Sequence, residues 1–183
     1  MRPRKRVERS DIQFRGKYIL ETALVDSYMT NAIANHFFLK GNPKRSDLML
    51  ILSNHDITFR TKEIIYRAIL KKRYPDLWKE HSRDVKKLKD IAEYRNMLAH
   101  WGSIPPPFGA DLSKVDYVTL YDIGKPEEPR QITKQSHNAK LKELLHLCGV
   151  TREIMNAIER RHPASKRLSK RRFKEMLKVY AEA

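Results

Sequence analysis

The chain contains almost none of the residues that build disulfide or metal frameworks. Cys148 is the only cysteine, so a disulfide framework is excluded and a reducing compartment, the cytoplasm, is expected. There are no cysteine pairs with zinc spacing, and the histidines outside one motif are scattered, so no metal or other cofactor is expected. The sequence motifs of phosphate-binding loops, dinucleotide-binding folds and zinc proteases are also missing.

Long hydrophobic runs and acidic residues are scarce as well. No run approaches the roughly 20 apolar residues of a membrane span, and the basic first nine residues are not followed by the hydrophobic core of a signal peptide. We therefore expect a soluble protein with no membrane partner. The 22 Asp and Glu face 38 Lys and Arg, a net charge of +16. This excess favours a polyanionic partner, nucleic acid or an acidic protein, although general solubility is the alternative.

Glycine and proline are few and mark the ends of long helical patterns. The predicted fold is all-α: a four-helix up-and-down bundle with an inserted β-hairpin and a basic C-terminal helix. Residues 1–162 would form the helical domain, with a basic N-terminal arm that ends at Ser10 or Asp11, and residues 163–183 a basic helix or tail. The expected long helices are residues 12–39, 58–74, 83–101 and 136–161, with a short one beginning at Ser46.

The segment after Gly102 departs from this helical pattern. Gly102 is the expected C-cap of helix 83–101, and the prolines of residues 104–109 predict an extended loop. Residues 115–123 and 130–133 read as two strands joined by a turn. This hairpin could carry specificity for a substrate, or it could be decoration.

The predicted helix 83–101 carries the most informative residues. Its apolar positions recur at helical spacing and form one stripe: Val85, Leu88, Ile91, Ala92, Leu98 and Ala99. Arg95 falls near the centre of this stripe. An arginine there is costly unless it snorkels to the surface, is paired, or binds an anion. Glu21 lies on the apolar face of the first helix, where it either reaches water or pairs with Arg95 and orients the guanidinium.

Two further polar residues lie at the end of the same helix. Asn96 and His100 are four residues apart and share one flank, and the helix dipole favours a protonated imidazole at His100. A fixed cation, an amide and a titratable ring suit a scissile phosphate, since no nucleophilic side chain lies beside them. Arg95 and His100 are about 140° apart around an ideal helix. Their convergence therefore requires the reach of Arg95, fraying of the helix end, or a second copy of the chain.

The pattern Arg95-Asn96-x-x-x-His100 resembles the motif of the HEPN superfamily, small helical domains of prokaryotic toxins, anti-phage systems and RNA-processing enzymes. The resemblance covers roughly residues 15–160. It implies a metal-independent endoribonuclease that works as a homodimer, with the motifs of both protomers lining one cleft. It further implies a toxin or defence effector, with an antitoxin protein as a partner.

Two other functions compete with a nuclease. A non-catalytic HEPN-like module would bind RNA or protein and use Arg95 only as an anion clamp or in an ion pair. In the third interpretation the chain is a basic helical domain whose Arg95 pairs with Glu21 and whose tails bind nucleic acid.

The final segment is strongly basic. As a helix it would be amphipathic, and three roles compete: an RNA-binding patch, a membrane-surface helix, or a helix docked on the core. We favour docking through its apolar side, with the basic side contacting RNA phosphates. The expected RNA-binding residues are Lys166, Arg167, Lys170, Arg171, Arg172, Lys174 and Lys178.

Overall fold

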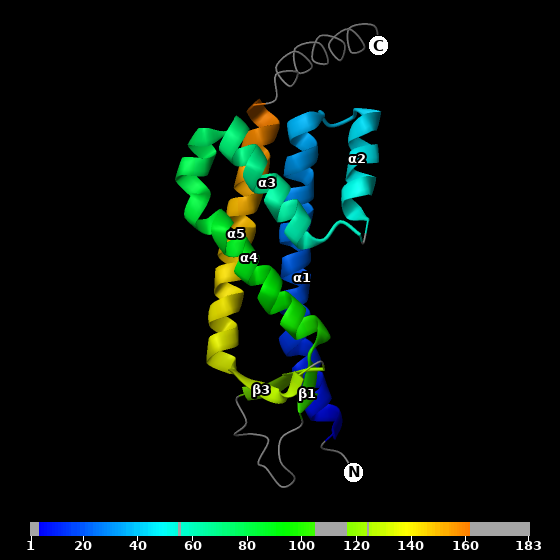
Figure 1. The fold of residues 1–183 in the computed structure, drawn as a ribbon, viewed down its shortest axis with the longest axis vertical. Coiled ribbons are helices and arrows are strands. Elements are labelled where there is room, and N and C mark those ends of the chain that lie inside the picture. The colour runs from blue at the N-terminus through cyan, green and yellow to red at the C-terminus, as the bar shows by residue number, and fades with distance from the viewer. Residues whose placement is uncertain (1–3, 55, 105–116, 124, 162–183) are drawn as a thin grey trace, which may run out of the picture. The chain divides into compact units, whose positions relative to one another are not determined.

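The chain is mostly helical in the computed structural model (Figure 1). The structure describes residues 4–54, 56–104, 117–123 and 125–161, and it describes the side chains of these ranges except for residues 4–14 and 125–127. Its elements are α1 (Arg4–Phe37), α2 (Pro43–Ser53), α3 (Phe59–Arg73), α4 (Pro75–His100), β1 (Gly102–Ile104), β2 (Tyr117–Asp122), β3 (Lys125–Thr133) and α5 (Lys134–Arg161). The helices predicted between residues 12 and 161 and the hairpin are therefore confirmed, although β3 begins at Lys125, within the predicted turn. The predicted C-terminal helix and nearly all of the extended loop lie outside the described residues. None of these helices combines the length and the hydrophobicity that a membrane span requires.

Helices α1 and α4 begin eight residues earlier than their sequence patterns predicted. Helix α1 begins at Arg4, so from that residue on there is no separate arm before Ser10 or Asp11. Arginine, lysine and glutamate favour helices, and they dominate residues 4–9, so nothing there stops the helix. Helix α4 begins at Pro75 instead of near Arg83. Proline is well tolerated at the first helical position, and the carboxylate of Asp76 in the first turn complements the helix dipole.

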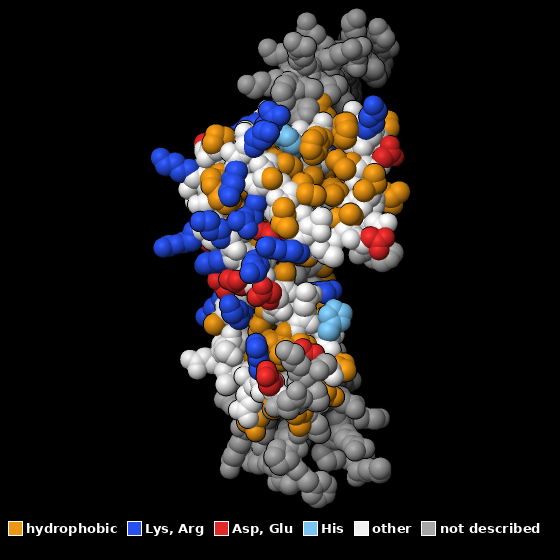
Figure 2. Space-filling model, viewed as in Figure 1, with side chains coloured by type: hydrophobic (Ala, Val, Ile, Leu, Met, Phe, Trp, Pro, Cys, Tyr) orange, Lys and Arg blue, Asp and Glu red, His pale blue; other side chains and the backbone are white. Residues whose placement is uncertain are grey.

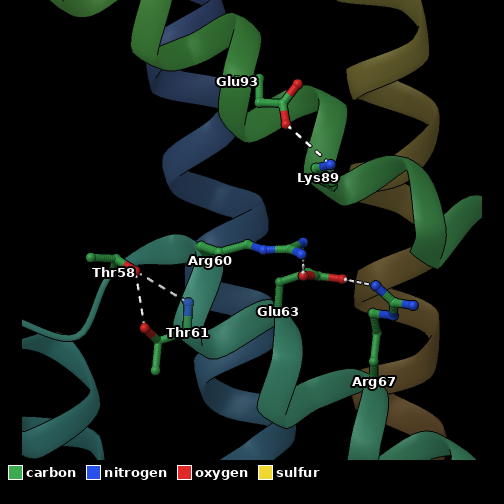
Figure 3. Close-up of polar contacts among 7 residues, drawn as sticks. All are labelled: Thr58, Arg60, Thr61, Glu63, Arg67, Lys89 and Glu93. Carbon is green, nitrogen blue, oxygen red and sulfur yellow. Dashed lines mark hydrogen bonds and ion pairs between the residues drawn. The ribbon is translucent and has the colours of Figure 1, made fainter.

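Helix α2 begins three residues before the predicted Ser46, and α2 and α3 both begin with a side-chain cap. The side chain of Asn42 accepts a hydrogen bond from the backbone N–H of Lys44, and Pro43 opens α2. The Oγ1 atom of Thr58 accepts one from the backbone N–H of Thr61 at the start of α3 (Figure 3). Both caps satisfy donors that a helix start leaves without partners, which explains why the helices begin at these positions.

The chain divides into two compact units, each built from segments distant in sequence. Unit 1 comprises residues 1–25 and 86–149, and unit 2 comprises residues 26–85 and 150–183. Helices α1, α4 and α5 contribute residues to both units.

Unit 1 contains the C-terminal end of α4, with Arg95, Asn96 and His100, and the three strands of the described residues. Its core comes from α1, α4, α5 and the sheet: Tyr18, Val25, Leu88, Ile91, Ala92, Leu98, Leu120, Ile132, Leu144 and Leu147 are buried. The antiparallel sheet has the order β1-β2-β3, and Figure 1 shows it at the end of α4, where α5 begins. Strand β1 was not predicted.

Gly102 is the first residue of β1 and does not cap α4 in the left-handed conformation that was expected. Among the glycines of the described residues only Gly41 has a positive φ, 88°. Gly102 instead lies opposite Tyr121 in the β1–β2 register. A Cβ atom on Gly102 would overlap the Tyr121 ring, so glycine is needed here because of a close approach between a ring and the backbone.

Unit 2 has a core that includes charged side chains. Its apolar part comes from α1, α3, α4 and α5: Met29, Ile33, Tyr66, Leu70, Leu77, Val85, Ile154 and Ile158 are buried. The Nζ atom of the buried Lys62 lies 2.6 Å from Oδ2 of Asp26. The carboxylate of Glu63 is fully buried and lies 2.5 Å from Nη1 of Arg60 and 2.9 Å from Nη1 of Arg67 (Figure 3). Two guanidinium groups therefore compensate one buried carboxylate.

Gly102→Ala should destabilise the protein because the new methyl group displaces the Tyr121 ring. We expect the free energy of unfolding to fall by about 1 kcal/mol, measured by urea denaturation. In a Tyr121→Ala background the same change should cost much less, which a double-mutant cycle would show. Gly16→Ala is the control: no atom lies near its added methyl group in α1, and alanine should stabilise that helix by about 0.5–1 kcal/mol. Equal costs of Gly102→Ala in both backgrounds would contradict the ring contact.

Glu63→Gln should be strongly destabilising because it removes the buried charge that two arginines share. We expect a loss of about 2–3 kcal/mol in the free energy of unfolding. The matched control is Glu93→Gln, which affects an exposed pair with 3.6 Å between Nζ of Lys89 and Oε1 of Glu93 (Figure 3). That change should stay within about 0.5 kcal/mol. Similar losses in the two variants would show that burial of Glu63 does not set its contribution.

Candidate functional site at the end of helix α4

The C-terminal half of α4 places one face in the core of unit 1 and the motif at the surface. Leu88, Ile91 and Leu98 are 1–2% exposed, as the stripe predicts, whereas Ala99 is exposed. Arg95 is half-buried, and Asn96 and His100 are exposed. Arg95 therefore avoids the cost of a fully buried charge, because its side chain stays partly exposed at the edge of the core.

Arg95 and Asn96 form a local pair. Nη1 of Arg95 donates a hydrogen bond to Oδ1 of Asn96 at 3.1 Å. Glu21 is half-buried, and the ion pair between Glu21 and Arg95 is not formed within the described part of unit 1. Because an amide oxygen carries no formal charge, the contact with Asn96 orients the guanidinium without neutralising it. The predicted orienting role of Glu21 thus falls to Asn96.

His100 is the last residue of α4, with its ring exposed to solvent. It follows Arg95 by five residues in an unbroken helix, which corresponds to about 140° around the axis and about 7.5 Å along it. The Arg95 side chain bonds to Asn96 and is not hydrogen-bonded to His100 in the described structure. One copy of the chain therefore presents both groups at one helix end without bringing them together.

Arg15 holds this helix end in place. Its Nη1 atom donates hydrogen bonds to the backbone oxygens of Leu98, at 3.1 Å, and Trp101, at 2.8 Å. The Leu98 carbonyl belongs to the last turn of α4 and the Trp101 carbonyl follows directly after it, where no helical N–H is available to bond either of them. A cation at this end also suits the helix dipole. Arg15 is thus the cap that was assigned to Gly102. Its role was not predicted, because Arg15 lies more than 80 positions from Leu98 and Trp101 in the sequence.

Trp101 and Arg130 extend the cationic surface beside His100. The guanidinium carbon of Arg130, on β3, lies 5.3 Å from the centroid of the Trp101 ring, within the range of a cation–π contact. Arg130 is exposed and Trp101 is half-buried. The hairpin therefore contacts Trp101, the residue that follows His100, and its role in specificity stays a prediction. Arg15, Arg95, His100 and Arg130 together bring basic groups from three elements to the end of α4.

A polar aromatic cluster packs around Tyr94 of α4, the residue directly before Arg95. The hydroxyl of Tyr94 and Nδ1 of the buried His137 are 3.0 Å apart, in a hydrogen bond. The Tyr18 ring packs edge-on against Tyr94, with 4.8 Å between their centroids. Burial raises the pKa of Tyr94 to about 12, so its hydroxyl stays protonated at neutral pH. The cluster fixes the rotation of α4 about its axis, and with it the direction in which Arg95 and His100 leave the helix.

An open hollow of about 550 Å³ lies next to this cluster. Its lining residues are Tyr94, Ile132, Ser136, Ala139, Lys140 and Glu143. Glu143 is paired with Lys87, with 3.2 Å between Oε1 and Nζ, and with Lys140, with 3.3 Å between Oε2 and Nζ. Because both lysines bind its carboxylate, we do not assign Glu143 a catalytic role in this hollow.

The remaining predicted residues belong to the C-terminal segment. The seven basic residues expected to bind RNA, Lys166, Arg167, Lys170, Arg171, Arg172, Lys174 and Lys178, fall outside the described residues. Among the residues that the structure describes, no three His, Cys, Asp or Glu side chains are grouped as a metal site would require.

Comparisons with known proteins found no relative of this chain. No protein-family model matches the chain, and no curated protein or solved structure matches it. The resemblance to the HEPN superfamily therefore depends on Arg95, Asn96 and His100 and on their position at the end of a helix.

Proposed function

We propose that the protein is a metal-independent endoribonuclease of HEPN type, which cleaves RNA through attack by the substrate's own 2′-hydroxyl. The observation that carries the proposal is the exposed His100 at the very end of α4, preceded by the oriented Arg95–Asn96 pair. The net charge of +16 supports a polyanionic substrate. The proposal includes assignment of the helices to a HEPN-like bundle, and a role as a toxin or defence effector that an antitoxin restrains.

The proposed reaction needs only a proton carrier and an anion clamp. As the 2′-oxygen bonds to phosphorus, its proton leaves to a base, and the bond from phosphorus to the 5′-oxygen breaks. The products are a 2′,3′-cyclic phosphate and a 5′-hydroxyl. His100, exposed and adjacent to solvent, accepts the first proton or donates one to the leaving oxygen. Arg95 holds the non-bridging oxygens while their charge builds, and Asn96 orients Arg95.

A second protomer would complete the site. In one chain Arg95 and His100 point about 140° apart, and Arg95 is bonded to Asn96. A two-fold axis near the end of α4 would place His100 of one protomer against Arg95 of its partner, which makes the site isologous. This is the physical reason to propose a homodimer.

The same geometry supports a second candidate, a non-catalytic RNA-binding module. Arg95 and Arg130 near the end of α4 would hold phosphates without any cleavage, and the separation of Arg95 from His100 favours this function if the chain is monomeric. Cleavage of RNA in the presence of EDTA separates the two candidates, because only the nuclease predicts it.

His100→Ala should abolish cleavage and leave the fold intact, because the ring is exposed and supports no core contact. We expect the single-turnover cleavage rate in EDTA to fall by at least about 100-fold, with an unchanged circular dichroism spectrum. His146→Ala, at an exposed histidine of α5, is the control and should keep the wild-type rate. A wild-type rate in His100→Ala would remove the catalytic assignment.

Mixing two inactive variants tests the shared site. Arg95→Ala and His100→Ala should each be inactive alone, yet an equimolar mixture should regain activity, since roughly half of the dimers would then carry one intact Arg95 and one intact His100. The measurements are cleavage in EDTA and molar mass by light scattering. A monomeric wild-type protein that still cleaves RNA would contradict the shared site.

A further inference from the structure

Helix α2, in unit 2, exposes aliphatic side chains that nothing in the described structure covers. Leu50 is 76% exposed and Ile51 is 60% exposed, whereas Leu52 is the buried residue of this helix. Figure 2 shows hydrophobic side chains gathered on this part of the surface. Neighbouring exposed aliphatic residues on one helix face indicate a binding surface.

Acidic residues flank this apolar face, although the chain as a whole is basic. Asp47 precedes Leu50 and Ile51 by one helical turn and is exposed, so it lies on the same face. Asp56, beyond the end of α2, is exposed too. We name Asp47, Leu50 and Ile51 the α2 face. Its chemistry suits an occupant with aliphatic or aromatic side chains next to basic ones.

The chain itself delivers such a segment close to α2. Helix α5 ends at Arg161, and Pro163 follows, which favours a change of direction. Near that end, Oε1 of Glu159 lies 2.9 Å from Nζ of Lys40, which precedes the N-cap of α2 by two residues. The segment that follows Arg161 therefore starts beside the turn that leads into α2.

Residues 162–183 lie outside the described residues, but their sequence has the required composition. The large apolar residues include Leu168, Phe173, Met176, Leu177 and Tyr180, and seven basic residues stand against only Glu175 and Glu182. The spacing of Phe173, Met176, Leu177 and Tyr180 matches one face of a helix. Its length also suffices, because 22 residues span about 33 Å as a helix, whereas Leu50 lies only about 10 Å along α2 from Pro43.

We propose that the C-terminal segment 162–183 docks in cis on the α2 face, covering Leu50 and Ile51 with its apolar side and facing Asp47 with basic side chains. Tethering gives this segment an effective concentration in the millimolar range for that face, so it outcompetes a second copy of the chain. Docking leaves the rest of its basic side chains at the surface. The inference does not depend on the nuclease assignment.

Disulfide trapping in the full-length chain tests the docking. Cys148 is first replaced by serine, and Leu50→Cys is then combined with Leu177→Cys. The control combines Leu177→Cys with Asn156→Cys, at an exposed position of α5 that is closer to residue 177 along the chain. Under mild oxidation at low concentration, docking predicts an intramolecular disulfide that forms at least about tenfold faster in the Leu50 variant than in the control. Equal rates in the two variants would overturn the proposal, because an undocked segment favours the nearer cysteine. Disulfide-linked dimers instead of monomers would overturn it too, in favour of a second copy as the occupant.

Hydrogen exchange gives an independent reading without cysteines. In the full-length Leu50→Ser/Ile51→Ser variant, amides of residues 168–180 should exchange about 10- to 100-fold faster than in the wild type, the loss expected when an apolar contact of this size is removed. The Asn156→Ser variant should exchange as the wild type does. Unchanged exchange of residues 168–180 in the Leu50→Ser/Ile51→Ser variant would overturn the docking.

Discussion

The hydrogen bonds from Arg15 to the last turn of α4 are the interaction on which the candidate site depends. They bind the carbonyl oxygens of Leu98 and Trp101 and so set the point at which α4 stops. The end of α4 determines where His100 is exposed, where Trp101 meets Arg130, and where Gly102 enters the sheet. A glycine cap would have ended the helix without linking it to any other element. The cap from Arg15 ends the helix and also attaches its end to α1 within the same unit.

The scarcity of acidic residues shapes the rest of the structure. Several of the few carboxylates are paired with basic side chains, and two of them hold a pair each. Glu63 holds Arg60 and Arg67 of its own helix, and Glu143 holds Lys87 of α4 and Lys140 of its own helix. Burial alone would raise the pKa of Glu143, but hydrogen bonds from the two lysines outweigh it and keep the pKa below its ordinary value. A hydrogen bond from Arg161 likewise lowers the pKa of Asp76. A carboxyl group with a lowered folded-state pKa stabilises the fold above its ordinary pKa and loses that contribution as the pH falls through the lowered value. Glu143 and Asp76 therefore contribute stability that the fold loses in acid.

The sequence predicted the helices, the hairpin and the buried stripe of α4 because these depend on periodicity and turn residues. It did not predict β1, because three residues next to a run of prolines are too few to show an alternating pattern. These residues form a strand because they pair with β2, which is distant in the sequence. The sequence named Arg95, Asn96 and His100 from their spacing on one helix. Arg15 and Arg130 could not be found in that way, since each reaches the site through the fold and neither has a local motif. The Glu21–Arg95 pair was predicted because both residues lie on apolar helix faces. In the structure Arg95 instead donates its hydrogen bond to Asn96, its neighbour in the sequence.

The division into two units, each assembled from distant segments, has a consequence for synthesis on the ribosome. Unit 1 combines residues 1–25 with 86–149, so its N-terminal helix segment must wait for more than half of the chain before its partners exist. Unit 2 likewise cannot complete its core until the part of α5 from Val150 to Arg161 has been synthesised. At roughly 5–20 residues per second, the first helix spends several seconds without its native contacts. Long stretches of like charge repel one another, so the basic excess of the chain helps keep these waiting segments apart until the last helix emerges.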